Sequence, residues 1–98
     1  MFNWLGYSPN ALDTYQKSID AFTEALLYAP KFIEALRNKG MVLASLGKLQ
    51  ADLSNKEEAS KNLKSSIETL SLSLQLNQDD DYILTFLKKI QELLDQCH

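Results

Sequence analysis

The sequence predicts an all-α fold of about four helices, arranged as antiparallel hairpins. Of its 98 residues, 45% are apolar, and only three are glycine and two proline, which argues against disorder. Apolar residues recur at steps of three and four along four stretches, and part of the pattern repeats further along the chain. We expect one domain over residues 1–98. The helices are expected at 9–28, 31–46, 55–76 and 80–95.

The first helix is expected to begin after Ser8, a hydroxyl N-cap, with Pro9 in the first turn, where its missing N–H costs little. Five large apolar residues share one face that should be buried: Leu12, Tyr15, Ile19, Phe22 and Leu26. Ala29 and Pro30 end the helix, because the residue before a proline is pushed out of the helical region.

The second helix carries the apolar positions Ile33, Leu36, Gly40 and Leu43. It is expected to end at Leu46, because Gly47 suits a left-handed C-terminal cap. Glycine inside a helix costs about 1 kcal/mol relative to alanine. Gly40 therefore predicts the close approach of a neighbouring helix, and a tolerated weak position is the alternative.

Two further helices follow. Ser54 and Glu57 have the spacing of a capping box, which predicts the start of the third helix. Its apolar face consists of Ala59, Leu63, Ile67, Leu70 and Leu74. Asp79, Asp80 and Asp81 give the fourth helix an acidic start that the helix dipole favours. Its apolar face consists of Ile83, Leu87, Ile90 and Leu94.

Residues 11–28 match residues 59–76 at a constant offset of 48. The matched pairs have the same or a similar residue type: Ala11 and Ala59, Tyr15 and Leu63, Ser18 and Ser66, Ile19 and Ile67, Phe22 and Leu70, Leu26 and Leu74. Two amphipathic helices can agree in apolar positions by chance, but the matching serines add specificity. A repeated pair of helices explains the match better.

The segment 18–30 resembles the second helix of a tetratricopeptide repeat (TPR), and the segment 36–47 resembles the first helix of the next repeat. The signature positions are Ser18, Phe22, Ala25, Pro30, Leu36, Gly40, Leu43, Gly47, Ser66, Leu70 and Leu74. Three residues depart from the family pattern: Lys39, Gln78 in place of proline, and Lys88 in place of the helix glycine. The resemblance implies an α-solenoid of helix hairpins, with the fourth helix as a cap.

A standard repeat of this family has about 34 residues, so an offset of 48 implies fourteen extra residues. We place them in the second helices of the repeats. Fourteen residues make about four helical turns, which keeps the apolar face nearly in phase. We therefore expect two lengthened second helices flanking one short first helix. This form resembles the long-repeat variant found in tandem TPR proteins of cyanobacteria.

The TPR resemblance implies a non-catalytic scaffold that binds a partner peptide or helix. The residues that match the family's groove lining are Glu34, Arg37, Asn38, Met41 and Ser45. Arg37 beside Asn38 is suited to hold a partner's carboxylate. Ordinary solvation of the arginine is the alternative.

A second function class is a small structural protein that self-associates through exposed apolar helix faces. The fourth helix carries Leu84, Phe86 and Leu93 in addition to its apolar face, which predicts either a homo-oligomer or a place in a longer array. The alternative is that these side chains close the core of one monomer.

Other function classes are not expected. The formal charge of −3 disfavours nucleic acid and anionic membranes as partners. The only histidine, His98, adjoins the only cysteine, Cys97, at the end of the chain, where a catalytic pair lacks a rigid frame. No metal-binding or cofactor-binding spacing appears, so no cofactor is expected. The single cysteine and the absence of a signal-like start favour a cytoplasmic setting.

Overall fold

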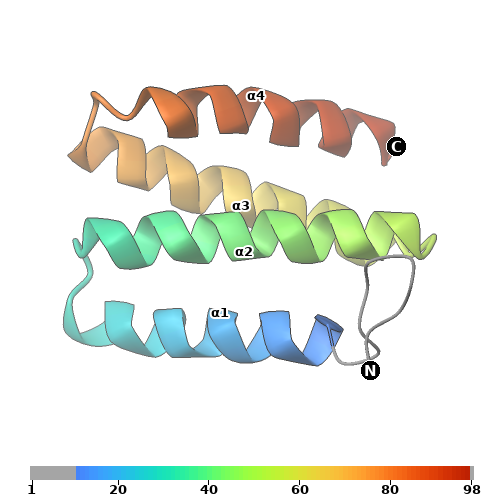
Figure 1. Cartoon of the computed structure of the whole chain (residues 1–98), viewed down its shortest axis with the longest axis horizontal. Coiled ribbons are helices and arrows are strands. Elements are labelled where there is room, and N and C mark those ends of the chain that lie inside the picture. The colour runs from blue at the N-terminus through green and yellow to red at the C-terminus, as the bar shows by residue number, and fades with distance from the viewer. Residues whose placement is uncertain (1–10, 98) are drawn as a thin grey trace.

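Four α-helices make up most of the chain that the computed structural model describes, residues 11–97. They are α1 (Ala11–Tyr28), α2 (Ile33–Asp52), α3 (Lys56–Leu76) and α4 (Asp81–Gln96). Successive helices run antiparallel, with α1 and α4 at the outer edges and α2 and α3 between them (Figure 1). The radius of gyration, 13.5 Å, is close to the roughly 13 Å of a folded 100-residue domain. These residues contain no strand, and the predicted all-α class and four helices are confirmed.

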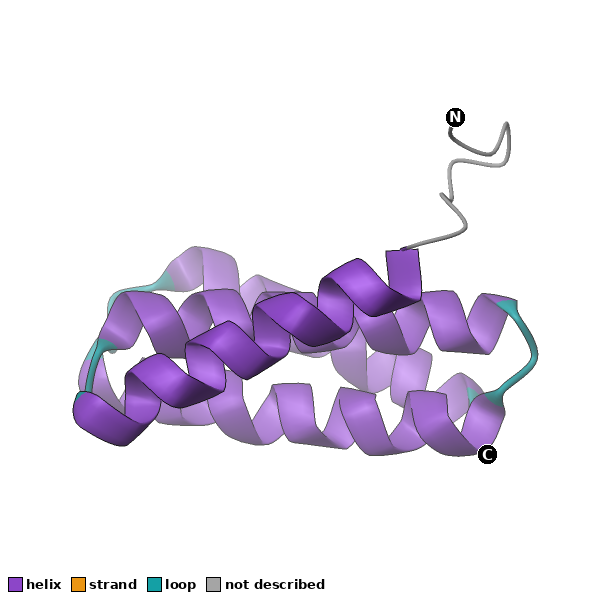
Figure 2. Cartoon of the chain, turned by 90° about the horizontal axis from the view of Figure 1, so that it is seen from below, coloured by secondary structure: helices purple, strands orange, loops and turns teal. Residues whose placement is uncertain are grey.

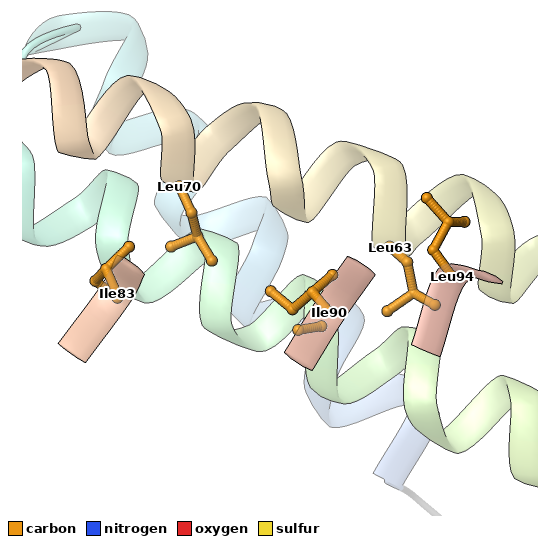
Figure 3. Close-up of a cluster of buried hydrophobic side chains, with 6 residues drawn as sticks. Leu63, Leu70, Ile83, Ile90 and Leu94 are labelled. Carbon is orange, nitrogen blue, oxygen red and sulfur yellow. The ribbon is translucent and has the colours of Figure 1, made fainter. Parts of the chain in front are cut away.

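The main core lies where α3 meets α2 and α4. Leu63 and Leu70 of α3 point toward side chains of α4 (Figure 3). The cluster consists of Ala44, Leu63, Leu70, Ile83, Ile90 and Leu94, each almost fully buried. All of these residues except Ala44 fall on the apolar faces predicted for the third and fourth helices, and Ile67, Leu74 and Leu87 of those faces are half-buried against the same cluster. The two predicted faces are therefore confirmed. Burial of such side chains stabilises the fold by about 1.5–3 kcal/mol each.

Helix α1 is less well covered than predicted. Within residues 11–97 it packs against α2 alone, and it runs obliquely across the other helices in Figure 2. Only Ile19 is buried, against Leu43 and Leu46, and Tyr15 is half-buried beside it. Leu12, which was expected to be buried, is 41% exposed. The predicted helix start at Pro9 lies outside the described residues.

Helix α2 is longer than predicted, and the expected end at residue 46 is wrong. It continues through Gly47 to Asp52 and has 20 residues. Gly47 is not a left-handed cap but a point of close packing, because a Cβ built there would lie 2.8 Å from Leu63 Cγ. The prediction of a short first helix between two lengthened ones is therefore also wrong. The extra residues lengthen α2 as well as α3.

The turn between α2 and α3 replaces the predicted capping box. Ser54 adopts a left-handed backbone with φ of 66°, and its N–H donates to the Ala51 carbonyl at 3.0 Å. The Asn55 N–H donates to the Gln50 carbonyl at 2.8 Å, which completes a Schellman motif. The N-cap of α3 is Asn55, whose side-chain oxygen accepts from the Glu58 N–H at 3.5 Å. Ser54 thus ends α2 instead of starting α3.

The acidic start predicted for α4 is present. Asp80 is the N-cap, and its Oδ1 accepts a hydrogen bond from the Ile83 N–H at 3.3 Å. Asp81 lies in the first turn, where a negative charge complements the helix dipole. The predicted bounds of this helix, 80–95, are within one residue of the observed ones.

Candidate partner-binding groove

Close packing of α2 on α3 holds the central pair of helices together. A Cβ built on Gly40 would lie 2.5 Å from Leu70 Cγ, so this position has room only for glycine. The Ser66 hydroxyl, which is fully buried, donates to the Gly40 carbonyl at 2.6 Å. The close approach predicted at Gly40 is therefore confirmed, and α3 provides the neighbouring helix.

The TPR signature positions differ in burial. Six are buried, and all six belong to α2 or α3: Leu36, Gly40, Leu43, Gly47, Ser66 and Leu70. Four are half-buried: Ser18, Phe22, Ala25 and Leu74. Pro30 is exposed in the turn between α1 and α2.

Ser18 and Ser66, matched by the internal repeat, make different hydrogen bonds. Ser66 reaches the neighbouring helix, whereas the Ser18 hydroxyl donates to the Thr14 carbonyl of its own helix at 3.1 Å. The difference follows from packing: the face of α3 that carries Ser66 lies on α2, and the matching face of α1 is half-buried. A repeat in sequence therefore does not give equal burial.

The five residues predicted to line a groove follow one another along α2. Glu34 and Asn38 are exposed, and Arg37 and Met41 are half-buried. Met41 packs against the main core. The Ser45 hydroxyl is exposed and donates to the Met41 carbonyl of its own helix at 3.1 Å.

Arg37 binds a carboxylate of this chain. Its Nε donates to Asp80 Oδ2 at 2.9 Å, with the Arg37 side chain 36% and the Asp80 side chain 11% exposed. The guanidinium carbon lies 5.5 Å from the centre of the Tyr82 ring, a cation–π geometry. Asp80 therefore caps α4 with one oxygen and ties α4 to α2 with the other. Arg37, which was expected to bind a partner's carboxylate, thus binds Asp80 of the same chain, where α2 meets the start of α4.

A groove runs between α2 and α4 farther along. We call it the α2–α4 groove, and its lining consists of Ala44, Ser45, Lys48, Phe86, Lys89, Ile90 and Leu93. Its volume is about 250 Å³. Ala44 and Ile90 form the floor and belong to the main core. The apolar side chains Phe86 and Leu93 pack on the same core and stay partly exposed.

A more polar hollow of about 370 Å³ adjoins the groove and shares two residues with it, Lys48 and Leu93. Its remaining lining consists of Ala51, Asp52, Lys56, Gln96 and Cys97. The Lys48 ammonium donates to Asp52 Oδ2 at 3.3 Å across one turn of α2. Together, the groove and the hollow follow the α2–α4 boundary toward the end of α4.

Sequence reasoning found only one residue of the α2–α4 groove, Ser45. It assigned Phe86 and Leu93, with Leu84, to self-association or to stacking in a longer array, and not to a groove with α2. It overlooked the lysines at 48 and 89. The available signal was spacing: Phe86, Ile90 and Leu93 are four and three residues apart, and Lys89 lies beside them.

Other site chemistry is absent from the part of the chain that the structure describes. No three His, Cys, Asp or Glu side chains there lie close enough to hold a metal ion. Cys97 is a half-buried free thiol, and His98 lies outside the described residues. Among residues 11–97, no helix combines the length and the apolar character needed to cross a membrane.

Comparisons of this chain with protein-family models, with curated proteins and with solved structures found no match.

Proposed function

We propose that this chain is a non-catalytic scaffold that binds a peptide or helix of a partner protein in the α2–α4 groove. The observation that carries the proposal is the partly exposed apolar surface of Phe86 and Leu93, which lies between two helices beside Ser45. Core packing fixes its floor, so a partner meets a preformed surface and loses little affinity to reorganisation of the site. Partly exposed aromatic and aliphatic side chains in a groove are typical anchors for a partner segment.

The proposal includes a TPR-type arrangement, in which α1 and α3 are second helices and α2 and α4 are first helices. Three observations support it: the offset of 48 residues between α1 and α3, the antiparallel order, and the seat of Leu70 on Gly40. The α2–α4 groove would then lie between successive first helices. A cytoplasmic setting also belongs to the proposal, supported by the single cysteine.

The test is to block the groove without disturbing the fold. Ser45→Trp places a large side chain at an exposed position that lines the groove. Ala21→Trp is the matched control, because Ala21 is an exposed helical residue of α1. Immobilised wild-type chain should retain specific proteins from an extract of the source cells, and Ser45→Trp should lose them while Ala21→Trp keeps them. Equal retention by both variants would show that the groove is not the binding site.

Self-association is a second candidate, favoured by apolar side chains that the monomer leaves uncovered. Leu27 and Tyr28 at the end of α1 are 76% and 84% exposed. Phe32 in the following turn and Leu84 of α4 are about half exposed. Light scattering at several protein concentrations separates the two functions. A stable dimer whose formation is unchanged by Ser45→Trp would favour self-association, whereas a monomer at all concentrations would exclude it.

A further inference from the structure

The border of the α2–α4 groove carries an excess of positive charge. Lys48 and Lys89 line the groove, and Lys56 lines the adjoining hollow. The acidic residue in these linings is Asp52, which pairs with Lys48. Within residues 11–97, Lys56 and Lys89 form no ion pair. This local excess stands out because the whole chain has a net charge of −3.

The lysines surround an apolar floor, not an open polar surface. Ile90 is almost fully buried at the bottom, and Phe86 and Leu93 lie one turn to either side of it along α4. The Phe86 ring also stacks on Tyr82, with the ring centres 6.1 Å apart. An occupant therefore gains most by placing apolar side chains on the floor and negative groups at the border.

We propose that the occupant is an acidic segment of a partner protein, with one or two large apolar side chains flanked by carboxylates. This inference depends on the proposed function and adds the chemistry of its ligand. The apolar side chains would contact Phe86, Ile90 and Leu93. The carboxylates would meet Lys89 and Lys56, with Lys48 between them.

Two other occupants fit these observations less well. A second copy of the chain brings a net charge of −3, but five of its thirteen acidic residues already pair with basic residues of the same chain, including Asp80 in the acidic run 79–81. An anionic lipid surface is flat, whereas Ile90 lies almost fully buried at the floor of a groove. A narrow acidic segment reaches the floor and the lysines together.

The experiment selects peptides from a displayed library of random 12-residue sequences on the immobilised full-length chain at low salt. Selected peptides should carry two or more Asp or Glu residues within a few positions of Leu, Phe or Trp. A selected peptide is then synthesised, and its affinity is measured by fluorescence anisotropy. Lys89→Gln and Lys56→Gln should each weaken binding about two- to fivefold, as expected for exposed ion pairs. Higher salt should weaken the wild-type complex in the same direction.

The matched control is Lys64→Gln, which removes an exposed lysine of α3 outside the groove and should leave the affinity unchanged. Neutral or basic selected peptides that bind Lys89→Gln as tightly as wild type, but not Ser45→Trp, would overturn the acidic chemistry and keep the proposed function. Selected peptides that bind Ser45→Trp as tightly as wild type, or a selection that enriches no peptide, would count against both the proposed function and the acidic chemistry of its ligand. Lysine-dependent sedimentation of the chain with phosphatidylserine vesicles, without acidic peptide binding, would assign the surface to lipid and overturn the inference.

Discussion

The Ser66 hydroxyl of α3 donates a 2.6 Å hydrogen bond to the main-chain carbonyl of Gly40 on α2. A side-chain donor reaches the backbone of a neighbouring helix only where that helix carries no bulky group. Gly40 supplies that condition, and Leu70 fills the space where a Cβ would lie. The glycine, the serine and the leucine therefore form one packing unit.

Gly40→Ala should lower the free energy of unfolding by about 1–2 kcal/mol. Alanine favours the helix by about 1 kcal/mol, but overpacking a filled core costs about 1–3 kcal/mol or more, and Leu70 is fully buried with little freedom to move. Urea denaturation followed by circular dichroism measures the change. In a Leu70→Ala background the clash is gone, so the same substitution should become neutral or stabilising. An equal loss in both backgrounds would contradict this contact.

Ser73→Ala should raise the free energy of unfolding by about 1 kcal/mol. The Ser73 hydroxyl is buried, and among the described residues it has no hydrogen-bond partner, so its removal relieves a desolvation cost. Ser66→Ala is the matched control on the same face of α3 and should lower stability by about 1 kcal/mol, because its hydrogen bond is lost. We therefore predict changes of opposite sign in the free energy of unfolding, and chemical denaturation of both variants tests this prediction. A loss for Ser73→Ala would indicate a hidden partner.

Ser54→Gly should stabilise the chain by about 0.5–1 kcal/mol. A left-handed backbone is strained for serine and free of that strain for glycine. Thermal unfolding detects the change as a higher Tm. The result also distinguishes two structures of the turn, one in which Ser54 ends α2 and one in which it is the N-cap of α3. If Ser54 were the N-cap that the sequence suggests, glycine would cost a few tenths of a kcal/mol and alanine about 1 kcal/mol.

Asp80→Asn and Asp80→Ala should separate the two roles of this carboxylate. Asparagine keeps an oxygen that caps α4 but removes the charge that pairs with Arg37, which should cost about 0.5–1 kcal/mol. Alanine also removes the cap, so its cost should be larger by about 1 kcal/mol. Denaturation at low and high salt gives the test, because only the ion-pair contribution should shrink with salt. Equal losses for the two variants would mean that the cap contributes nothing.

The sequence predicted which residues enter helices far better than where one helix ends. The apolar faces of α3 and α4 follow from spacing, because burial of a regular stripe is common to all helices that pack on a core. The end of α2 does not follow from spacing. A glycine at position 47 fits two structures equally well: a left-handed helix cap, or a helix interior with room for the Leu63 side chain of a neighbouring helix. Only the neighbouring helix decides between these two structures.

The candidate site was predictable only in part. Ser45 lies on the groove, as the resemblance implied, but four of the seven lining residues come from α4, which was expected to be a cap. Arg37 shows a further limit, since its partner, Asp80, lies 43 residues away, and no local pattern indicates that pair. Sites built from two distant helices need the packing angle and register, which spacing within one helix does not contain.

The unequal packing of α1 implies two levels of resistance to opening. Along α1 only Ile19 is buried, whereas α2, α3 and α4 share a continuous core. Amide hydrogen exchange should therefore be faster in α1 than in α3, because detaching α1 exposes little apolar surface. Exchange measured by mass spectrometry on proteolytic fragments tests this expectation, and uniform protection of the four helices would refute it. The outer helix should then open and reclose while the surface between α2 and α4 keeps its shape.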